Sequence, residues 1–257
     1  MCAVEELVAE FRSVSLAALE ERASLQRRVD NKYALPFETF AELLARLRGG
    51  HDVLEIDGRR EFAYASTYFD TPDLRCFRDH VEDRKPRFKV RTRLYADSGD
   101  CEFEVKLKRE DGETDKRRLD YPAEDRDLLT REAHAFLFEA LRDAGLEPPD
   151  HVDPALTTSF RRATLAARDG ADRLTADVEI RLAAPGGRTA MLREDVVLVE
   201  TKSETGESEA DAELRDLGLE PISLSKYRVG MALVGAAGAA GEQPGHELFE
   251  RAGRALG

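Results

Sequence analysis

Strict alternation of apolar and charged residues predicts several β-strands along the chain. In residues 87–95, RFKVRTRLY, Phe, Val, Thr and Leu alternate with Arg, Lys, Arg and Arg. Side chains of a strand point to its two faces in turn, so this strand carries one largely apolar face and one basic face. The other segments that combine apolar with charged or polar faces are residues 27–36, 101–110, 111–122, 155–167, 172–184 and 194–204.

Helical spacing of apolar residues predicts the remaining elements. Residues 37–50 and 125–145 read as amphipathic helices that end near glycine, and residues 209–219 as a third. One or two helices are expected within residues 5–26, and residues 60–73 read as a strand that runs into a turn, with Asp70 as a turn former. We expect an N-terminal helical segment over 1–24, a main domain over 25–234, and a Gly/Ala-rich linker with a short helix over 235–257.

The repetition of charged strand faces determines the predicted fold. A single strand of this kind usually turns its charged face to water. With helices available to cover the apolar faces, the charged faces of many strands would instead line the inside of a closing sheet. We therefore predict an α+β fold, a closed antiparallel β-barrel of about eight strands with helices outside, wide enough for one small ligand. Its cations need a counter-charge, and a chain of phosphates is the obvious candidate.

Composition narrows the possible partners. The 257 residues carry a formal net charge of -13, so the far field repels nucleic acids and anionic membranes, and the cations must act locally. The three cysteines lack metal-site spacing and are expected to be free thiols. Neither a secretion signal nor a membrane-length apolar run is seen, so we expect a cytoplasmic protein without direct membrane insertion.

Seven motifs in order resemble the VTC domain, the polyphosphate polymerase domain of the triphosphate tunnel (CYTH-like) superfamily. They are RVDNKYALP, YFDTPDL, KVRTRLY, FEVKLKRE with DKRRL, LTADVEI, VVLVETK and LSKYRVG. The lead-in resembles the bacterial soluble members. The resemblance implies an eight-stranded antiparallel tunnel that binds triphosphate with a divalent metal. The eukaryotic polymerase of the family moves the γ-phosphate of ATP onto polyphosphate, and superfamily relatives hydrolyse triphosphates or cyclise ATP.

The resemblance also assigns residues. It implies eight phosphate ligands: Lys32, Arg91, Arg93, Lys106, Lys116, Arg162, Arg173 and Lys226. Glu200 matches the metal-binding glutamate for Mn²⁺ or Mg²⁺, with Glu104, Asp177 and Glu179 as possible helpers. Arg91, Arg93, Lys106 and Glu200 would carry the catalysis.

Two readings of the strand 87–95 remain open on the residues alone. Arg91 and Arg93 could be paired with Glu102 and Glu104 on a neighbouring strand, which the residues by themselves favour. The resemblance favours phosphate binding.

The sequence departs from the family pattern at four positions. Phe160 stands where a tyrosine is expected, and Ser223 where the eukaryotic enzyme has a second lysine. Thr201 and Ala176 replace residues that are usually apolar and larger, respectively.

The expected function is polyphosphate polymerase activity, with a nucleoside triphosphate and polyphosphate as partners. Phosphoryl transfer needs in-line positioning and positive charge but no protein nucleophile. The alternatives are a triphosphatase, in which water replaces the acceptor, and a module that binds polyphosphate without turnover. A nucleic-acid binder is disfavoured by the acidic net charge. The sequence leaves open whether the chain forms a homodimer or has a membrane-protein partner.

Overall fold

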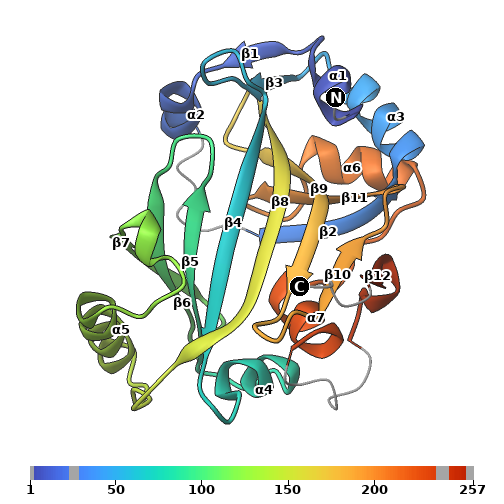
Figure 1. Ribbon diagram of the computed structural model, residues 1–257. Coiled ribbons are helices and arrows are strands. Elements are labelled where there is room, and N and C mark those ends of the chain that lie inside the picture. The colour runs from blue at the N-terminus through green and yellow to red at the C-terminus, as the bar shows by residue number, and fades with distance from the viewer. Residues whose placement is uncertain (1–2, 23–28, 236–242, 253–257) are drawn as a thin grey trace. The chain divides into compact units, whose positions relative to one another are not determined.

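The computed structural model describes residues 3–22, 29–235 and 243–252, and its elements can be followed in Figure 1. Cys2, the expected boundary at residue 24 and most of the glycine-rich stretch after 235 lie outside these residues. The chain divides into two compact units. Unit 1 comprises Met1–Phe62, Phe160–Ile180 and Leu192–Leu224, and unit 2 comprises Ala63–Ser159, Arg181–Met191 and Ser225–Gly257.

The described residues form twelve strands, seven α-helices and two short 3-10 helices. The strands are β1 Arg12–Val14, β2 Val29–Pro36, β3 His51–Leu54, β4 Glu61–Asp70, β5 Arg87–Tyr95, β6 Cys101–Lys108, β7 Thr114–Asp120, β8 Asp153–Ala167, β9 Arg173–Ala183, β10 Thr189–Leu192, β11 Val196–Ser203 and β12 Phe249–Ala252. The helices are α1 Ala3–Val8, α2 Leu16–Arg22, α3 Phe37–Leu47, α4 Arg75–Val81, η1 Ala123–Asp125, α5 Arg131–Asp143, α6 Glu209–Asp216, α7 Lys226–Leu233 and η2 His246–Leu248. No helix in this part of the chain is long and apolar enough to cross a membrane.

The α+β class and the large antiparallel sheet are confirmed, but the expected closed barrel is wrong. Backbone pairing follows the order β12-β10-β9-β8-β4-β5-β6-β7, with β11 joining β9 to β2, and β3 joining β8 to β1. Within the described residues β7 pairs only with β6, and β2 only with β11. The sequence of β7, TDKRRLD, explains the open edge, since charged side chains on an edge strand keep further strands from adding to it.

The N-terminal segment contains two helices, α1 and α2, as expected, and one strand that was not expected. A short strand, β1, separates the two N-terminal helices and pairs in parallel with β3. Near the C-terminus the expected helix is wrong over the described residues, because Phe249–Ala252 forms β12 beside β10. The segment HELFER contains good helix formers. Its Phe249 is nevertheless buried, and its backbone satisfies the edge of β10, which outweighs local propensity.

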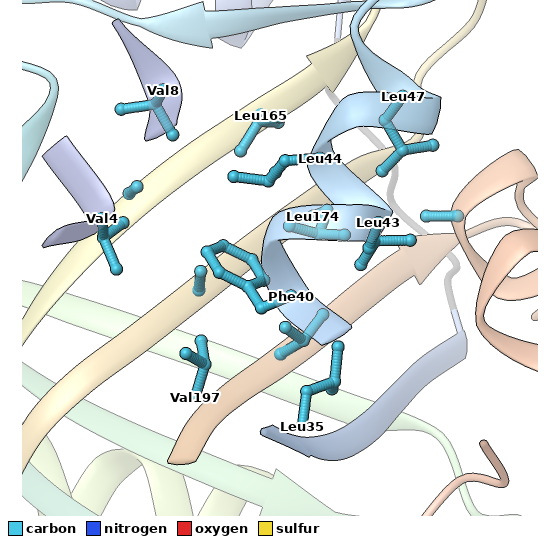
Figure 2. Close-up of a cluster of buried hydrophobic side chains, with 14 of the residues drawn as sticks. Val4, Val8, Leu35, Phe40, Leu43, Leu44, Leu47, Leu165, Leu174 and Val197 are labelled. Carbon is cyan, nitrogen blue, oxygen red and sulfur yellow. The ribbon is translucent and has the colours of Figure 1, made fainter. Parts of the chain in front are cut away.

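The core of unit 1 lies on the apolar face of its strands, under α1 and α3. Phe40, Leu43, Leu44 and Leu47 recur at helical spacing on α3, and all four are buried. Figure 2 shows these side chains above the strands, together with the labelled residues Val4, Val8, Leu35, Leu165, Leu174 and Val197. Leu35, Leu174 and Val197 sit on the parity opposite to the charged residues of β2, β9 and β11, respectively. The charged faces of these strands therefore point away from the helical layer.

Unit 2 repeats this arrangement on the other strands. Phe103 of β6 is fully buried, and its ring centroid lies 6.3 Å from that of Phe136 on α5 and 6.3 Å from that of Phe69 on β4. Helix α5 is started by Thr130, whose side chain accepts a hydrogen bond from the amide of Ala133. The apolar face of β6 is thus covered by a helix, and its charged residues belong to the opposite face.

Candidate phosphate-binding site

The charged residues of β2, β11 and β9 in unit 1 stand in register. They form two cross-strand rows, Lys32–Glu200–Thr175 and Asp30–Lys202–Arg173. Residues directly opposite in antiparallel strands have Cβ atoms about 5 Å apart, so each row is a line of neighbouring side chains. Three of the predicted residues, Lys32, Arg173 and Glu200, are therefore brought together.

Glu200 is the acidic centre of this group. Its Oε1 lies 2.9 Å from the Nζ of Lys202. Burial opposes ionisation of Glu200, but the charges of Lys202, Lys32 and Arg162 outweigh it and hold the pKa of Glu200 well below its usual range. The carboxylate is therefore ionised at neutral pH and surrounded by cations.

Arg162 and Asp177 form a bidentate ion pair in the same unit. Arg162 donates from Nε to Oδ1 at 2.6 Å and from Nη2 to Oδ2 at 2.8 Å. The guanidinium carbon also lies 5.1 Å from the ring centroid of Phe160, so phenylalanine keeps the cation–π contact without the expected hydroxyl. Glu179 is exposed, whereas Asp177 is buried, and the φ of Glu179, 53°, lies in the left-handed region.

The carboxylates of unit 1 suit one mode of metal binding. Within the described ranges no three His, Cys, Asp or Glu side chains come together to hold an ion, so a protein-only cage is absent there. Mg²⁺ is usually held by one or two carboxylates together with substrate phosphates and water. Glu200, ionised and 22% exposed at its side chain, suits that mode, whereas Asp177 is occupied by Arg162. The metal roles of Glu200, Asp177 and Glu179 remain predictions.

In unit 2, three strands place further charges in register. Their rows are Lys89–Lys106–Lys116, Arg91–Glu104–Arg118 and Arg93–Glu102–Asp120, each running across β5, β6 and β7. The first row contains only lysines. The other two contain at least one carboxylate each.

Glu104 holds the middle row together. It is 2% exposed, its Oε2 accepts a hydrogen bond from Arg91 Nε at 2.5 Å, and its Oε1 is paired with Lys116. Burial opposes its ionisation, but Arg91, Arg93 and Lys116 outweigh it and depress its pKa. Burial, together with Arg91 and Arg93, lowers the pKa of Lys116 to about 7, although Glu104 acts in the other direction. The predicted pairing of Arg91 with Glu104 is therefore present, and the metal role of Glu104 remains a prediction.

Helix α7 brings Lys226 to this unit. Ser225 caps the helix by accepting from the amide of Arg228, and Lys226 is its first residue. The next residue, Tyr227, donates its hydroxyl to Asp70. Asp70, predicted as a turn former, accepts hydrogen bonds from the amides of Thr71, Cys76 and Phe77.

The structure thus sorts the predicted phosphate ligands into two groups. Lys32, Arg162 and Arg173 belong to unit 1, and Arg91, Arg93, Lys106, Lys116 and Lys226 to unit 2. Sequence reasoning did not assign Lys89, Lys202 or Tyr68 to the site. For the two lysines the signal was their parity with Arg91 and Glu200; for Tyr68, inside a largely apolar stretch, there was none.

Two of the four departures from the family pattern lie away from the charged faces. Ala176 is fully buried in the core of unit 1. Thr201 points toward α6, where its hydroxyl donates to Asp211 at 2.7 Å. Both side chains therefore lie outside the charged rows.

Comparison with known proteins assigns the chain to a family. A family model described as the VTC domain matches residues 27–235. The chain resembles the structure titled as a putative adenylyl cyclase, HpAC1, from Hippeastrum with a dominant triphosphatase activity, at 16% identity and a TM-score of 0.48, covering 80% of this chain and 95% of that one. It also resembles PH1819 from Pyrococcus horikoshii OT3 (16%, TM-score 0.41, 78% and 93% covered) and the conserved hypothetical protein Pfu-838710-001 from Pyrococcus furiosus (13%, TM-score 0.40, 78% and 98%). No curated protein matches the sequence.

Proposed function

Because the chain belongs to the VTC domain family, we propose that it is a phosphotransferase that moves the γ-phosphate of a nucleoside triphosphate such as ATP onto a polyphosphate chain. Family membership supports action on triphosphates or polyphosphate in general. The choice of transfer over hydrolysis is the proposal.

The row of three lysines carries this proposal. Lys89, Lys106 and Lys116 stand opposite one another on adjacent strands. Like charges directly opposite one another destabilise a sheet, so a row of three favours a bound anion, although Lys116 is also paired with Glu104 of the next row. Lys106 is exposed, and the other two are half-buried. A linear chain of phosphates, with negative charge on every unit, matches such a row better than a compact anion.

The chemistry needs little beyond positioning. The terminal oxygen of the polyphosphate chain forms a bond to the γ-phosphorus, while the bond to the oxygen that bridges the β- and γ-phosphates breaks and that oxygen leaves with the nucleoside diphosphate. Arg91 and Arg93 would bind the non-bridging oxygens of the transferred group, since guanidinium groups make paired contacts to phosphate. Glu200 would hold Mn²⁺ or Mg²⁺ together with the phosphates, and the ion would neutralise charge there.

The test is incubation of the purified protein with ATP and Mn²⁺ or Mg²⁺. Long-chain polyphosphate is resolved on a gel, and free phosphate and cyclic AMP are measured in parallel. Lys106→Gln and Glu200→Gln are compared with Arg46→Gln, which removes a cation paired with Glu42 and Glu213 on the helical surface of unit 1.

We expect polyphosphate ladders from the wild type and from Arg46→Gln, and a loss of about tenfold or more in Lys106→Gln and Glu200→Gln. Free phosphate without ladders would replace transfer by hydrolysis. Tight binding of tripolyphosphate without any product would indicate a binding module.

A further inference from the structure

Tyr68 of β4 lies beside the arginine that is expected to bind phosphate. The two residues are paired across the β4–β5 ladder. Arg91 Nη1 donates a hydrogen bond to the Tyr68 hydroxyl at 3.0 Å, and its guanidinium carbon lies 5.6 Å from the ring centroid. The side chain of Arg91 therefore rests on the phenol and reaches its oxygen.

The Tyr68 hydroxyl still has a proton to give. A phenol can accept hydrogen bonds and donate one, and the bond from Arg91 uses only its acceptor side. No acceptor for the Tyr68 proton is found among residues 3–22, 29–235 and 243–252. The hydroxyls of four other tyrosines each donate to an oxygen: Tyr33 to Asp211, Tyr95 to Glu102, Tyr121 to the Leu128 carbonyl and Tyr227 to Asp70. Tyr68 differs from these four in keeping its donor unused next to a cation.

The surroundings of this hydroxyl attract an anion. Burial opposes ionisation of Tyr68, but Arg91 and Arg93 from β5 and Lys226 from α7 outweigh it and lower its pKa. The pKa values of Tyr95 and Tyr227 are instead raised, first by burial and then by nearby carboxylates. A more acidic phenol in a positive potential is a stronger donor to a phosphate oxygen.

The ring of Tyr68 is also held in place. It stacks on Tyr227 with centroids 5.0 Å apart and planes at 26°, and Tyr227 is fixed through its hydroxyl to the buried Asp70. Tyr68 is only 7% exposed, so its side chain has little room to adopt another rotamer. A donor held in this way costs little ordering entropy when a ligand arrives.

We infer that the Tyr68 hydroxyl is a phosphate-binding group, which donates a hydrogen bond to a non-bridging oxygen of the phosphate bound by Arg91. The inference rests on the proposed function, because it takes the ligand to be a triphosphate or polyphosphate. It adds a neutral donor, directed at one oxygen, to a set of ligands that otherwise consists of cations. The competing explanation is that Tyr68 only packs under Arg91.

The test measures tripolyphosphate affinity by calorimetry, with the full chain and without added divalent metal. Tyr68→Phe removes the free donor and keeps the ring. Tyr95→Phe is the matched control, since it makes the same change on β5 at a hydroxyl that already donates to Glu102 at 3.1 Å. We expect Tyr68→Phe to bind about tenfold or more weakly, and Tyr95→Phe to bind within about threefold of the wild type.

Equal affinity of Tyr68→Phe and the wild type would overturn the inference and leave the proposed function standing. If the wild type itself does not bind tripolyphosphate, the proposed function fails and the inference fails with it.

A second experiment uses the wild type alone, so it tests the inference even if Tyr68→Phe does not fold. Near-ultraviolet phenolate absorbance is followed from neutral to alkaline pH with and without tripolyphosphate. One tyrosine should titrate early and move to higher pH when tripolyphosphate binds, and an unchanged titration would overturn the inference.

Discussion

We expect Glu104→Gln to make the protein less stable and, at the same time, to make it bind phosphate chains more tightly. Glu104 is 2% exposed and faces Arg91 at 2.5 Å, Lys116, and Arg118 at 3.8 Å. Glutamine keeps the shape and removes the charge. Removing one partner of a buried ion pair costs about 3–5 kcal/mol, and partial exposure of the cations lowers this to about 2–4 kcal/mol.

The gain in affinity follows from the same charge. At an effective dielectric constant of about 20, a phosphate charge about 6 Å from the carboxylate is repelled by about 3 kcal/mol. If solvent screens roughly half of this, loss of the carboxylate strengthens binding by about tenfold. Phosphate then becomes the counter-charge that Arg91 and Lys116 have lost.

The assay is urea unfolding with and without tripolyphosphate. The ligand-induced gain in the free energy of unfolding should be larger in Glu104→Gln than in the wild type, by about 1.4 kcal/mol at a ligand concentration well above both dissociation constants. Glu102→Gln serves as the control, because Glu102 is 21% exposed at its side chain and should change both quantities by less than about 1 kcal/mol. An equal or smaller ligand-induced gain in Glu104→Gln would refute the reasoning, since the cations around Glu104 would then not meet phosphate.

Two further predictions concern the same unit. Tyr227→Phe removes the hydroxyl that donates to the buried carboxylate of Asp70, so the free energy of unfolding should fall by about 1.5–3 kcal/mol in urea titrations, and a change below about 0.5 kcal/mol would contradict this hydrogen bond. The pKa of Lys116 is lowered to about 7 in the free protein, and bound phosphate should raise it, so tripolyphosphate binding at pH 8 should take up as much as about one proton. Calorimetry in two buffers of different ionisation enthalpy measures that uptake, which Lys116→Gln should largely abolish; a binding enthalpy independent of buffer would contradict the expected rise.

The alternation of apolar and charged residues could predict which residues share a face of a strand. It could not predict which residues stand opposite one another on neighbouring strands. The burial of β5 follows the sequence from Phe88 to Thr92, with apolar residues inside and basic residues less buried. The row of three lysines depends on the register Lys89↔Lys106↔Lys116. A slip of two residues would keep every face the same and place Lys89 opposite Glu104 or Lys108. Register is determined by turns and by packing, which the strand pattern alone does not contain.

Closure of the sheet was mispredicted for a related reason. Whether a sheet closes depends on the two strands at its edges, and the alternating pattern looks the same in an edge strand and a central one. The charged strand β7 is predicted as a strand by the same kind of pattern as the central strands, although its composition suits an open edge. The role proposed for Tyr68 could not be found from the sequence because it depends on Arg91, which is distant in the sequence and meets Tyr68 through the β4–β5 ladder.

The charges of the two units show why this fold would keep an arrangement that weakens it. Each unit buries a carboxylate among cations, Asp177 in unit 1 and Glu104 in unit 2, and each of these carboxylates binds an arginine. Complete internal neutralisation would stabilise the free protein, but it would leave nothing for an anion to bind. The lysine row lacks a carboxylate at the register positions where one would neutralise it, while the chain as a whole carries a net charge of -13. Acidic residues are therefore abundant in the protein, yet none stands in this row and Glu104 reaches Lys116 from the next row, which is the distribution expected if a ligand supplies the rest of the negative charge.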